Sequence, residues 1–145
     1  MRLALAVALL AAAPVSAVAQ EAPPRVSHQW SEGRPFSGAV QVGDTYWFSG
    51  KIGASAETRA MTEGRTAAET RAILEQFRGL FEELGLGFED VVQATVYLSD
   101  IGTFGEMNGV YVEYFPTEPP ARETVAVAGL AGGATIEISF VAVKR

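Results

Sequence analysis

The stretch TIEISFVAV, residues 135–143, decides the fold, because most of its residues are β-branched or aromatic and it carries a single charge, the carboxylate of Glu137. This composition predicts a strand. Side chains alternate along a strand, so Ile136 and Phe140 lie on one face, which we expect to be the core, and Glu137 lies on the other. Glu137 is then either on a solvated face or at a subunit contact, where its carboxylate holds or deprotonates a water molecule.

The rest of the chain predicts an α+β domain with one sheet. Strands are expected over residues 25–30, 39–42, 45–49, 90–98 and 124–128, and amphipathic helices over residues 62–84 and 104–115. The first helix begins either with a capping box of Thr66 and Glu69 or at Thr62. The glycine-rich residues 129–133 are expected to join the last two strands as a hairpin. With both helices on one face, a closed homo-oligomer is the simplest cover for apolar residues on the other.

The N-terminus has the layout of a secretory signal peptide. Met1-Arg2 precedes an apolar run over residues 3–13, and Ala17-Val18-Ala19 reads as a cleavage motif. This run is shorter than the roughly 18 to 20 residues needed to span a bilayer, which disfavours a membrane anchor. We therefore expect residues 1–19 to be removed and residues 20–145 to form the mature domain. The predicted protein is periplasmic or secreted and does not insert into a membrane after cleavage.

The chain is acidic, with 11 Lys and Arg residues, 17 Asp and Glu residues and a formal net charge of −6. Removal of residues 1–19 takes away Arg2 and no acid, which leaves −7 on the side chains. An acidic surface disfavours nucleic acid and anionic membranes as partners. The absence of cysteine excludes disulfides, thiolate nucleophiles and zinc–cysteine sites. We expect a packing or surface role for His28, the only histidine, because no serine and aspartate accompany it in a triad order.

A second chemical feature precedes the last predicted strands, where Pro119 and Pro120 are followed by Ala121 and Arg122. Two prolines stiffen the backbone, so the guanidinium is presented with little conformational freedom. Such a guanidinium suits bidentate binding of a carboxylate. Read alone, the stretch is equally consistent with a surface arginine at a strand end.

Together these stretches resemble the C-terminal signature of the RidA (YjgF) family, the reactive-intermediate imine deaminases. The signature consists of Pro-Ala-Arg at residues 120–122, a β run, a glycine-rich turn and Ile-Glu-Ile at residues 136–138. The family's order and approximate spacing are also followed by Ser49-Gly50, Gly85-Leu86, residues 95–100, Met107-Asn108, Tyr111 and Tyr114-Phe115. The resemblance covers about residues 26–145.

The resemblance implies a chorismate-mutase-like α+β fold, with a mixed β-sheet and two helices packed on one face, assembled as a homotrimer with clefts at the subunit interfaces. Family members of the deaminase type, the 2-iminobutanoate/2-iminopropanoate deaminases, hydrolyse 2-imino acids and enamines to 2-oxo acids and ammonia without a metal or organic cofactor. By this resemblance Arg122 clamps the substrate carboxylate and Glu137 activates the attacking water. The other implied substrate-binding residues are Thr124, Ser49, Gly50, Asn108 and Phe36.

Three positions depart from the family pattern. Phe36 stands where an aromatic hydroxyl is common, and it cannot donate a hydrogen bond. Thr124 stands where cysteine is frequent, and Glu123 stands where small residues are usual. Glu123 either points away from the cleft or pairs with Arg122. Two functions therefore stay open. Retention of Arg122 and Glu137 favours a cofactor-free imine deaminase, whereas the departures and the exported location favour a binding or chaperone-like trimeric module for small carboxylates or misfolded partners.

Overall fold

The computed structural model describes residues 21–55, 58 and 60–145. The predicted signal peptide, residues 1–19, lies outside the described residues. The strands are β1 (Arg25–His28), β2 (Ala39–Val42), β3 (Thr45–Phe48), β4 (Lys51–Ile52), β5 (Val91–Leu98), β6 (Ala121–Ala126) and β7 (Ile136–Val143). The helices are α1 (Arg65–Leu84) and α2 (Phe104–Tyr114), with short 3₁₀ turns η1 (Phe88–Asp90), η2 (Ile101–Thr103) and η3 (Ala131–Gly133).

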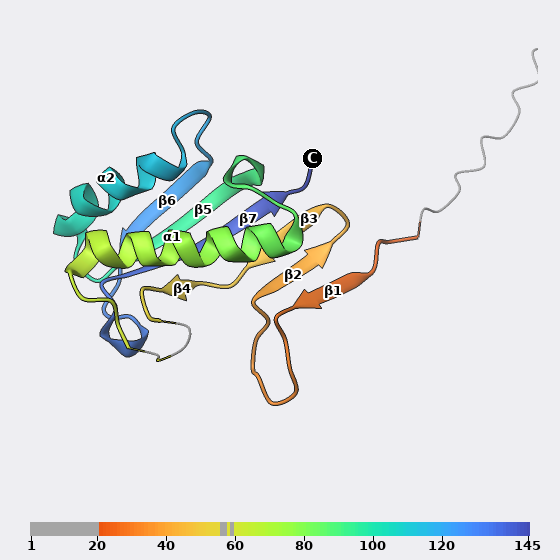
Figure 1. Cartoon of the computed structure of the whole chain (residues 1–145), viewed down its shortest axis with the longest axis horizontal. Helices are drawn as coiled ribbons and strands as arrows, with labels where there is room; N and C mark the ends of the chain where they lie inside the picture. Colours follow the sequence, from red (N-terminus) through yellow and green to blue (C-terminus); the bar gives the residue numbers. More distant parts are fainter. Residues whose placement is uncertain (1–20, 56–57, 59) are drawn as a thin grey trace, which may run out of the picture.

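All strands belong to one mixed sheet in the order β1-β2-β3-β7-β5-β6, and β4 follows β3 along the same side of β7. Only β5 and β6 run parallel to each other; the other pairs are antiparallel. Both helices cover one face of the sheet (Figure 1). The predicted α+β fold, with a mixed sheet and two helices on one face, is therefore confirmed.

The predicted hairpin between the last two strands is wrong. β5 lies between β6 and β7 and pairs with both. The reason is burial: alternate side chains of β5, among them Ala94, Val96 and Leu98, are fully buried, as a central strand requires, whereas most of β6 is exposed, as expected of an edge strand. The glycine-rich segment expected to make a tight turn instead forms η3, with Gly132 and Gly133 at positive φ, and returns the chain to the far side of β5.

An aromatic core lies between the helices and the sheet. Phe77 and Phe81 of α1 contact Phe48 of β3 and Phe140 of β7, with ring centroids 4.6 to 6.1 Å apart. Three of these four pairs are edge-to-face, which is a favoured arrangement of aromatic quadrupoles, and the fourth is tilted. His28 stacks on Tyr46 at the edge of this core, with its Nε2 3.0 Å from Gln41 Oε1. The expected packing role of His28 is confirmed.

Helix α1 begins neither at Thr62 nor with a capping box. Its N-cap is Gly64, at φ 105°, and no side chain caps the helix. A glycine reaches this left-handed conformation without steric cost, so the chain enters the helix there. Thr66 is buried inside the first turn, and Glu69 turns inward, where its carboxylate accepts a hydrogen bond of 2.8 Å from the backbone N–H of Thr135. The polar residue expected to cap the helix thus ties α1 to the segment before β7.

Helix α1 packs so closely against Gly53, the residue after β4, that adding one methyl group there should lower the stability of the fold. A Cβ at Gly53 would lie 2.6 Å from Glu69 Cβ and 2.7 Å from Glu69 Cα, so the helix backbone itself would have to move. We expect Gly53→Ala to lower the free energy of unfolding by about 3 kcal/mol in urea titrations. Gly79→Ala, on the exposed side of α1 with nothing within 4 Å of its Cβ, should instead raise it by about 0.5 to 1 kcal/mol. Equal effects of the two changes would contradict this packing.

The sheet surface away from the helices, here called the open face, is not polar. Trp47 on β3 and Val125 on β6 are 47% and 48% exposed there, and Val141 and Val143 on β7 are partly exposed. Glu137 lies on the same face, since it alternates with the buried isoleucines of β7. Among the described helices, none is long and apolar enough to cross a membrane.

Candidate functional site

Arg122 of β6 lies on the helix-covered face of the sheet. It pairs with Ala94 of β5, which in turn pairs with Phe140 of β7, and paired residues of neighbouring strands point to the same side. Ala94 and Phe140 are buried against the helices. Because β6 is the edge strand of the sheet, the Arg122 side chain lies at the margin of the core, next to α2.

Helix α2 provides the surroundings of this guanidinium. Arg122 Nη2 donates a hydrogen bond of 2.9 Å to Asn108 Oδ1, and the guanidinium carbon lies 4.5 Å from the ring centroid of Tyr111 and 5.6 Å from that of Phe104. Phe104, Asn108 and Tyr111 follow one another at steps of four and three residues, so they share one side of the helix. The resemblance to the family anticipated Asn108. We call Arg122, Asn108, Tyr111, Phe104 and Thr124 the arginine half-site.

The arginine half-site carries an unneutralised charge. Within the described part of the chain, no carboxylate lies within ion-pair distance of Arg122; the ion pairs found there join Arg71 to Glu113 and Arg78 to Glu75. Glu123 pairs with Thr95, is exposed, and points to the open face, so it does not neutralise Arg122. This outcome favours the first of the two expectations for Glu123 and leaves the cation available to a ligand.

Two hydroxyls of the arginine half-site have no hydrogen-bond partner among the described residues. They belong to Thr124, two residues beyond Arg122 on the same face of β6, and to Tyr111, which is only 3% exposed. Burial raises the pKa of the Tyr111 hydroxyl, and the positive charge of Arg122 opposes this rise. Tyr111 therefore stays a neutral phenol at ordinary pH, and its ring face supports the guanidinium by a cation–π contact.

Glu137 belongs to a second group of residues, on the open face. Its partner on β4 is Ile52, and its carboxylate leans over Gly50, so close that a Cβ on Gly50 would lie 1.9 Å from Glu137 Oε1. Ser49, next in the chain, donates a hydrogen bond of 2.7 Å from its Oγ to the carbonyl oxygen of Ser37. This bond fixes the loop that carries Phe36. We call Glu137, Gly50, Ser49 and Phe36 the glutamate half-site.

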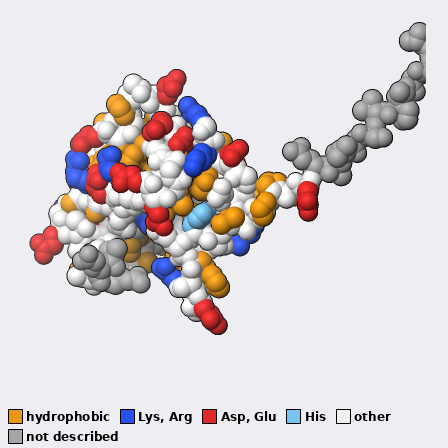
Figure 2. Space-filling view, turned by 45° about the vertical axis from the view of Figure 1, so that its right-hand side comes forward, with side chains coloured by type: hydrophobic (Ala, Val, Ile, Leu, Met, Phe, Trp, Pro, Cys, Tyr) orange, Lys and Arg blue, Asp and Glu red, His pale blue; other side chains and the backbone are white. Residues whose placement is uncertain are grey.

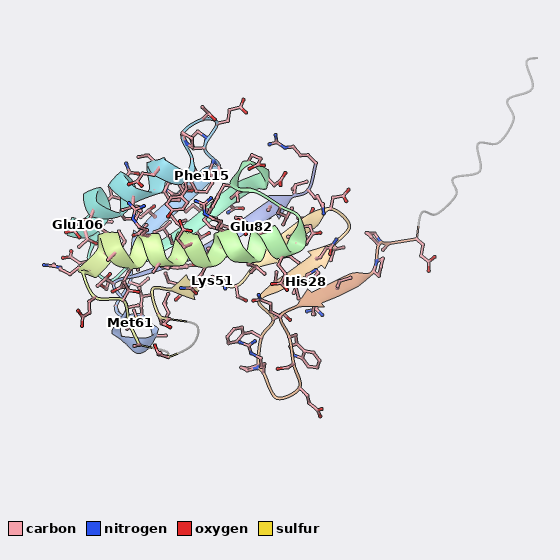
Figure 3. All side chains as sticks on the ribbon, viewed as in Figure 1. His28, Lys51, Met61, Glu82, Glu106 and Phe115 are labelled. Atoms are coloured by element: carbon pink, nitrogen blue, oxygen red, sulfur yellow. The ribbon has the colours of Figure 1, made fainter. Side chains whose placement is uncertain are left out.

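Phe36 and Ser49 line a cavity of about 510 Å³ on the open face. The cavity runs between β1 and the loop that joins β1 to β2. This loop projects from the body of the molecule and carries ring side chains (Figure 3). The space-filling view shows hydrophobic side chains and a cation on this projection, with an acidic side chain at its tip (Figure 2). Phe36 is 57% exposed, so its ring is available to a ligand or a partner.

The structure brings the predicted site residues together in two groups, not one. Arg122, Asn108 and Thr124 lie toward the helices, whereas Glu137, Gly50, Ser49 and Phe36 lie toward the open face. Within one chain, Arg122 and Glu137 therefore lie on opposite faces of the sheet, and the cleft between neighbouring subunits that the resemblance implies for them stays a prediction. The register through β5 is the reason, since it aligns Arg122 with the buried Ala94, whereas Glu137 pairs with Tyr97 on the other face of the sheet.

Gly50 offers a test of the glutamate half-site. The atom that a Cβ would displace is the end of the flexible Glu137 side chain, so we expect Gly50→Ala to change the free energy of unfolding by less than about 1 kcal/mol. The displaced carboxylate should lower kcat by about tenfold or more, because a misplacement of about 1 Å is costly in catalysis. Urea titration and turnover of the same preparation measure both quantities. A destabilised but fully active variant would contradict this assignment.

Arg25 and Ser37 are cavity residues that the sequence did not single out. Arg25 was counted only as part of a first strand, and no local pattern connects it with Phe36, eleven residues later. Tyr111 and Phe104 were detectable in principle, since their spacing from Asn108 predicts one helix face. Within the described residues, no group of three or more His, Cys, Asp or Glu side chains is arranged to hold a metal ion.

Comparison of the sequence with known proteins shows the family to which the chain is related. A family model described as Endoribonuclease L-PSP matches residues 27–144. The RutC family protein of Sulfurisphaera tokodaii is 37% identical over 110 residues, which are 76% of this chain and 88% of that protein. The human 2-iminobutanoate/2-iminopropanoate deaminase is 36% identical over 110 residues, which are 76% of this chain and 80% of that protein.

A solved structure extends the likeness to the fold. RidA from the Antarctic bacterium Psychrobacter sp. PAMC 21119 is 33% identical, and its structure superposes with a TM-score of 0.72 over 78% of this chain and 91% of that one. The matched region contains both half-sites and every strand except the first two residues of β1. The Pro-Ala-Arg and Ile-Glu-Ile stretches, the mixed sheet with its two helices and these matches together establish that the chain belongs to the RidA (YjgF) family.

Proposed function

We propose that this protein hydrolyses 2-imino acids and their enamine tautomers to 2-oxo acids and ammonia, without a cofactor, at sites formed between the subunits of a homotrimer. Relatives at about 35% identity bear the name 2-iminobutanoate/2-iminopropanoate deaminase, which supports a general imine deaminase role. The observation that carries the proposal is the environment of the Arg122 guanidinium. Asn108 and two aromatic rings hold it in place, and among the residues that the structure describes no carboxylate forms an ion pair with it.

This arrangement favours a small carboxylate as ligand. Arginine presents parallel N–H groups that match both oxygens of a carboxylate. Arg122 Nη2 is hydrogen-bonded to Asn108, and the rings of Tyr111 and Phe104 restrict the orientation of the guanidinium plane. The Arg122 side chain therefore loses little conformational entropy when a ligand binds. The 2-imino acids are planar around the carboxylate and the imine carbon, and a fixed fork orients that plane relative to a water molecule.

The separation of the two half-sites supports the proposed assembly. Arg122 and Glu137 point to opposite faces of one sheet, so both reach one substrate only if they come from different subunits. The open face, with Trp47 and Val125 about half exposed, favours such a contact. A heterologous contact, in which the arginine half-site of one subunit meets the glutamate half-site of the next, closes into a ring when the rotation allows it. A ring of three then contains three sites.

The proposed reaction needs positioning and one acid–base group. Arg122 holds the substrate carboxylate, while Glu137 of the neighbouring subunit accepts a proton from water as the water oxygen attacks the imine carbon. The resulting carbinolamine receives that proton on nitrogen. Its carbon–nitrogen bond then breaks while the Glu137 carboxylate accepts the hydroxyl proton, which gives ammonia and the 2-oxo acid, and ammonia carries that proton away as ammonium. A protonated imine is already electrophilic, so an acid–base contribution of about 10²- to 10⁴-fold is sufficient without a covalent nucleophile. Gly50, against which the carboxylate packs, fixes its position.

A measurement of turnover distinguishes the enzyme from the alternative, a binding or chaperone-like module. Imino acids are generated in the assay from alanine and 2-aminobutanoate by an amino-acid oxidase, and oxo-acid and ammonia release is followed with and without the mature protein. We expect release faster than the spontaneous hydrolysis, in proportion to the protein added. Equal rates with and without protein for every imino acid in the panel would favour the module.

A further inference from the structure

The cavity beside Phe36 extends along the open face to the first strand. Besides Phe36, its apolar lining residues are Trp30, Pro35 and Val40, and Ser37 and Ser49 add polar groups. The end at β1 carries Arg25 and Ser27. No acidic side chain is among the residues that line it. The cavity therefore combines apolar walls and serine hydroxyls with a cationic end, in a protein whose formal net charge is −6.

A hydrogen bond directs Arg25 toward the centre of this cavity. Its Nη1 donates a bond of 2.9 Å to Ser27 Oγ, two residues further along β1 on the same face of the strand. Since β1 runs antiparallel to β2, with Ser27 opposite Val40, this bond turns the guanidinium toward the Phe36 end. Among the described residues, Arg25 has no carboxylate within ion-pair distance. Its remaining N–H groups are available to a ligand.

The distance along the strands sets the length of that ligand. The backbone N–H of Ser49 donates a hydrogen bond to the carbonyl oxygen of Gly38, so Ser49 lies beside Gly38. Val40 follows Gly38 by two residues and pairs with Ser27, so the Ser27–Val40 pair lies roughly 7 Å from Ser49 along the strand. In a five-carbon dicarboxylic 2-imino acid the imine carbon and the distal carboxyl carbon are separated by three C–C bonds of about 1.5 Å, roughly 4 Å when extended. A hydrogen bond of about 2.9 Å completes the span.

We propose that Arg25 is a specificity-determining residue that binds the distal carboxylate of a dicarboxylic 2-imino acid, with 2-iminoglutarate as the best fit. The inference rests on the proposed function. The methylene groups of this substrate pack against Phe36 and Val40, so the absence of a hydroxyl on Phe36 suits the apolar part of the cavity. Water and 2-iminoglutarate give 2-oxoglutarate and ammonia, with no change of oxidation state.

The test compares two substrates and two variants. The imines of glutamate and alanine are generated by amino-acid oxidation, and kcat/KM is measured for the wild type, Arg25→Ala and, as a matched arginine on the helical face, Arg71→Ala. We expect the wild type and Arg71→Ala to prefer 2-iminoglutarate over 2-iminopropanoate by at least about tenfold, and Arg25→Ala to lose that preference. Hydrolysis of both imines at equal efficiency, with the same ratio in Arg25→Ala, would overturn the inference while leaving the proposed function standing.

Direct binding gives a readout that does not depend on catalysis. Calorimetric titration of the mature protein with 2-oxoglutarate and with pyruvate should show at least about tenfold tighter binding of the diacid, and Arg25→Ala should reduce this difference to less than about threefold. Should the wild type hydrolyse no imine, this result alone would still support a dicarboxylate site at Arg25. Equal affinities for both oxo acids in the wild type would overturn it.

Discussion

Replacement of Arg122 by alanine is expected to lower kcat/KM for 2-iminopropanoate by about 10²- to 10³-fold, because the substrate loses its only charged partner in the arginine half-site. Asn108, Tyr111 and Phe104 surround the guanidinium and should remain in place in the variant. The loss of kcat/KM then reports the lost contact between Arg122 and the substrate carboxylate, and not a change in α2. Saturation kinetics on freshly generated imine separate KM from kcat, and most of the effect should lie in KM.

Two further arginine variants make this result specific. Arg122→Lys keeps the charge but not the planar fork, and we expect it to recover only part of the lost efficiency. Arg71→Ala removes an exposed arginine that pairs with Glu113 on the helical surface, and it should retain wild-type turnover. Wild-type turnover by Arg122→Ala, with an unchanged thermal midpoint, would mean that the clamp is elsewhere or that the protein is not an imine hydrolase.

Glu137→Gln is expected to lower kcat by about 10²- to 10⁴-fold with a small change in KM, because glutamine keeps the size of the side chain and loses the base. The neighbouring contact with Gly50 is preserved, so the variant should fold like the wild type. Single-turnover measurements with excess protein, at several pH values, report the chemical step directly. A kcat within threefold of the wild type would show that another group activates the water.

Mixed trimers test the arrangement of subunits. If each site takes Arg122 from one subunit and Glu137 from the next, unfolding and refolding Arg122→Ala together with Glu137→Gln in equal amounts gives about three quarters mixed trimers, each with one complete site out of three. Activity should then return to about one quarter of the wild-type value. If both residues acted within one chain, the mixture would stay as inactive as its components. Sedimentation of the mixture confirms that the subunits have exchanged into trimers.

Local patterns in the sequence predicted most of the elements. The alternation in residues 135–143 fixed the faces of β7, and the four- and three-residue steps of Ile73, Phe77 and Leu80 fixed the buried side of α1. These features depend on neighbours within about one turn or one strand. The start of α1 was missed, because Gly64 enters the helix at positive φ and because Glu69 finds its partner 66 residues away, at Thr135.

The sequence by itself determined which chemical groups the protein possesses: a stiffened arginine, one carboxylate in an apolar strand, no cysteine and an acidic surface. Only the tertiary structure decided which groups meet. The long-range pairing of β5 between β6 and β7 sends Arg122 toward α2 and Glu137 toward the open face, and the pairing of β1 with β2 places Arg25 in the cavity of Phe36. Strand order reflects competition for the most buried position in the sheet, which depends on the whole chain and leaves no local signal.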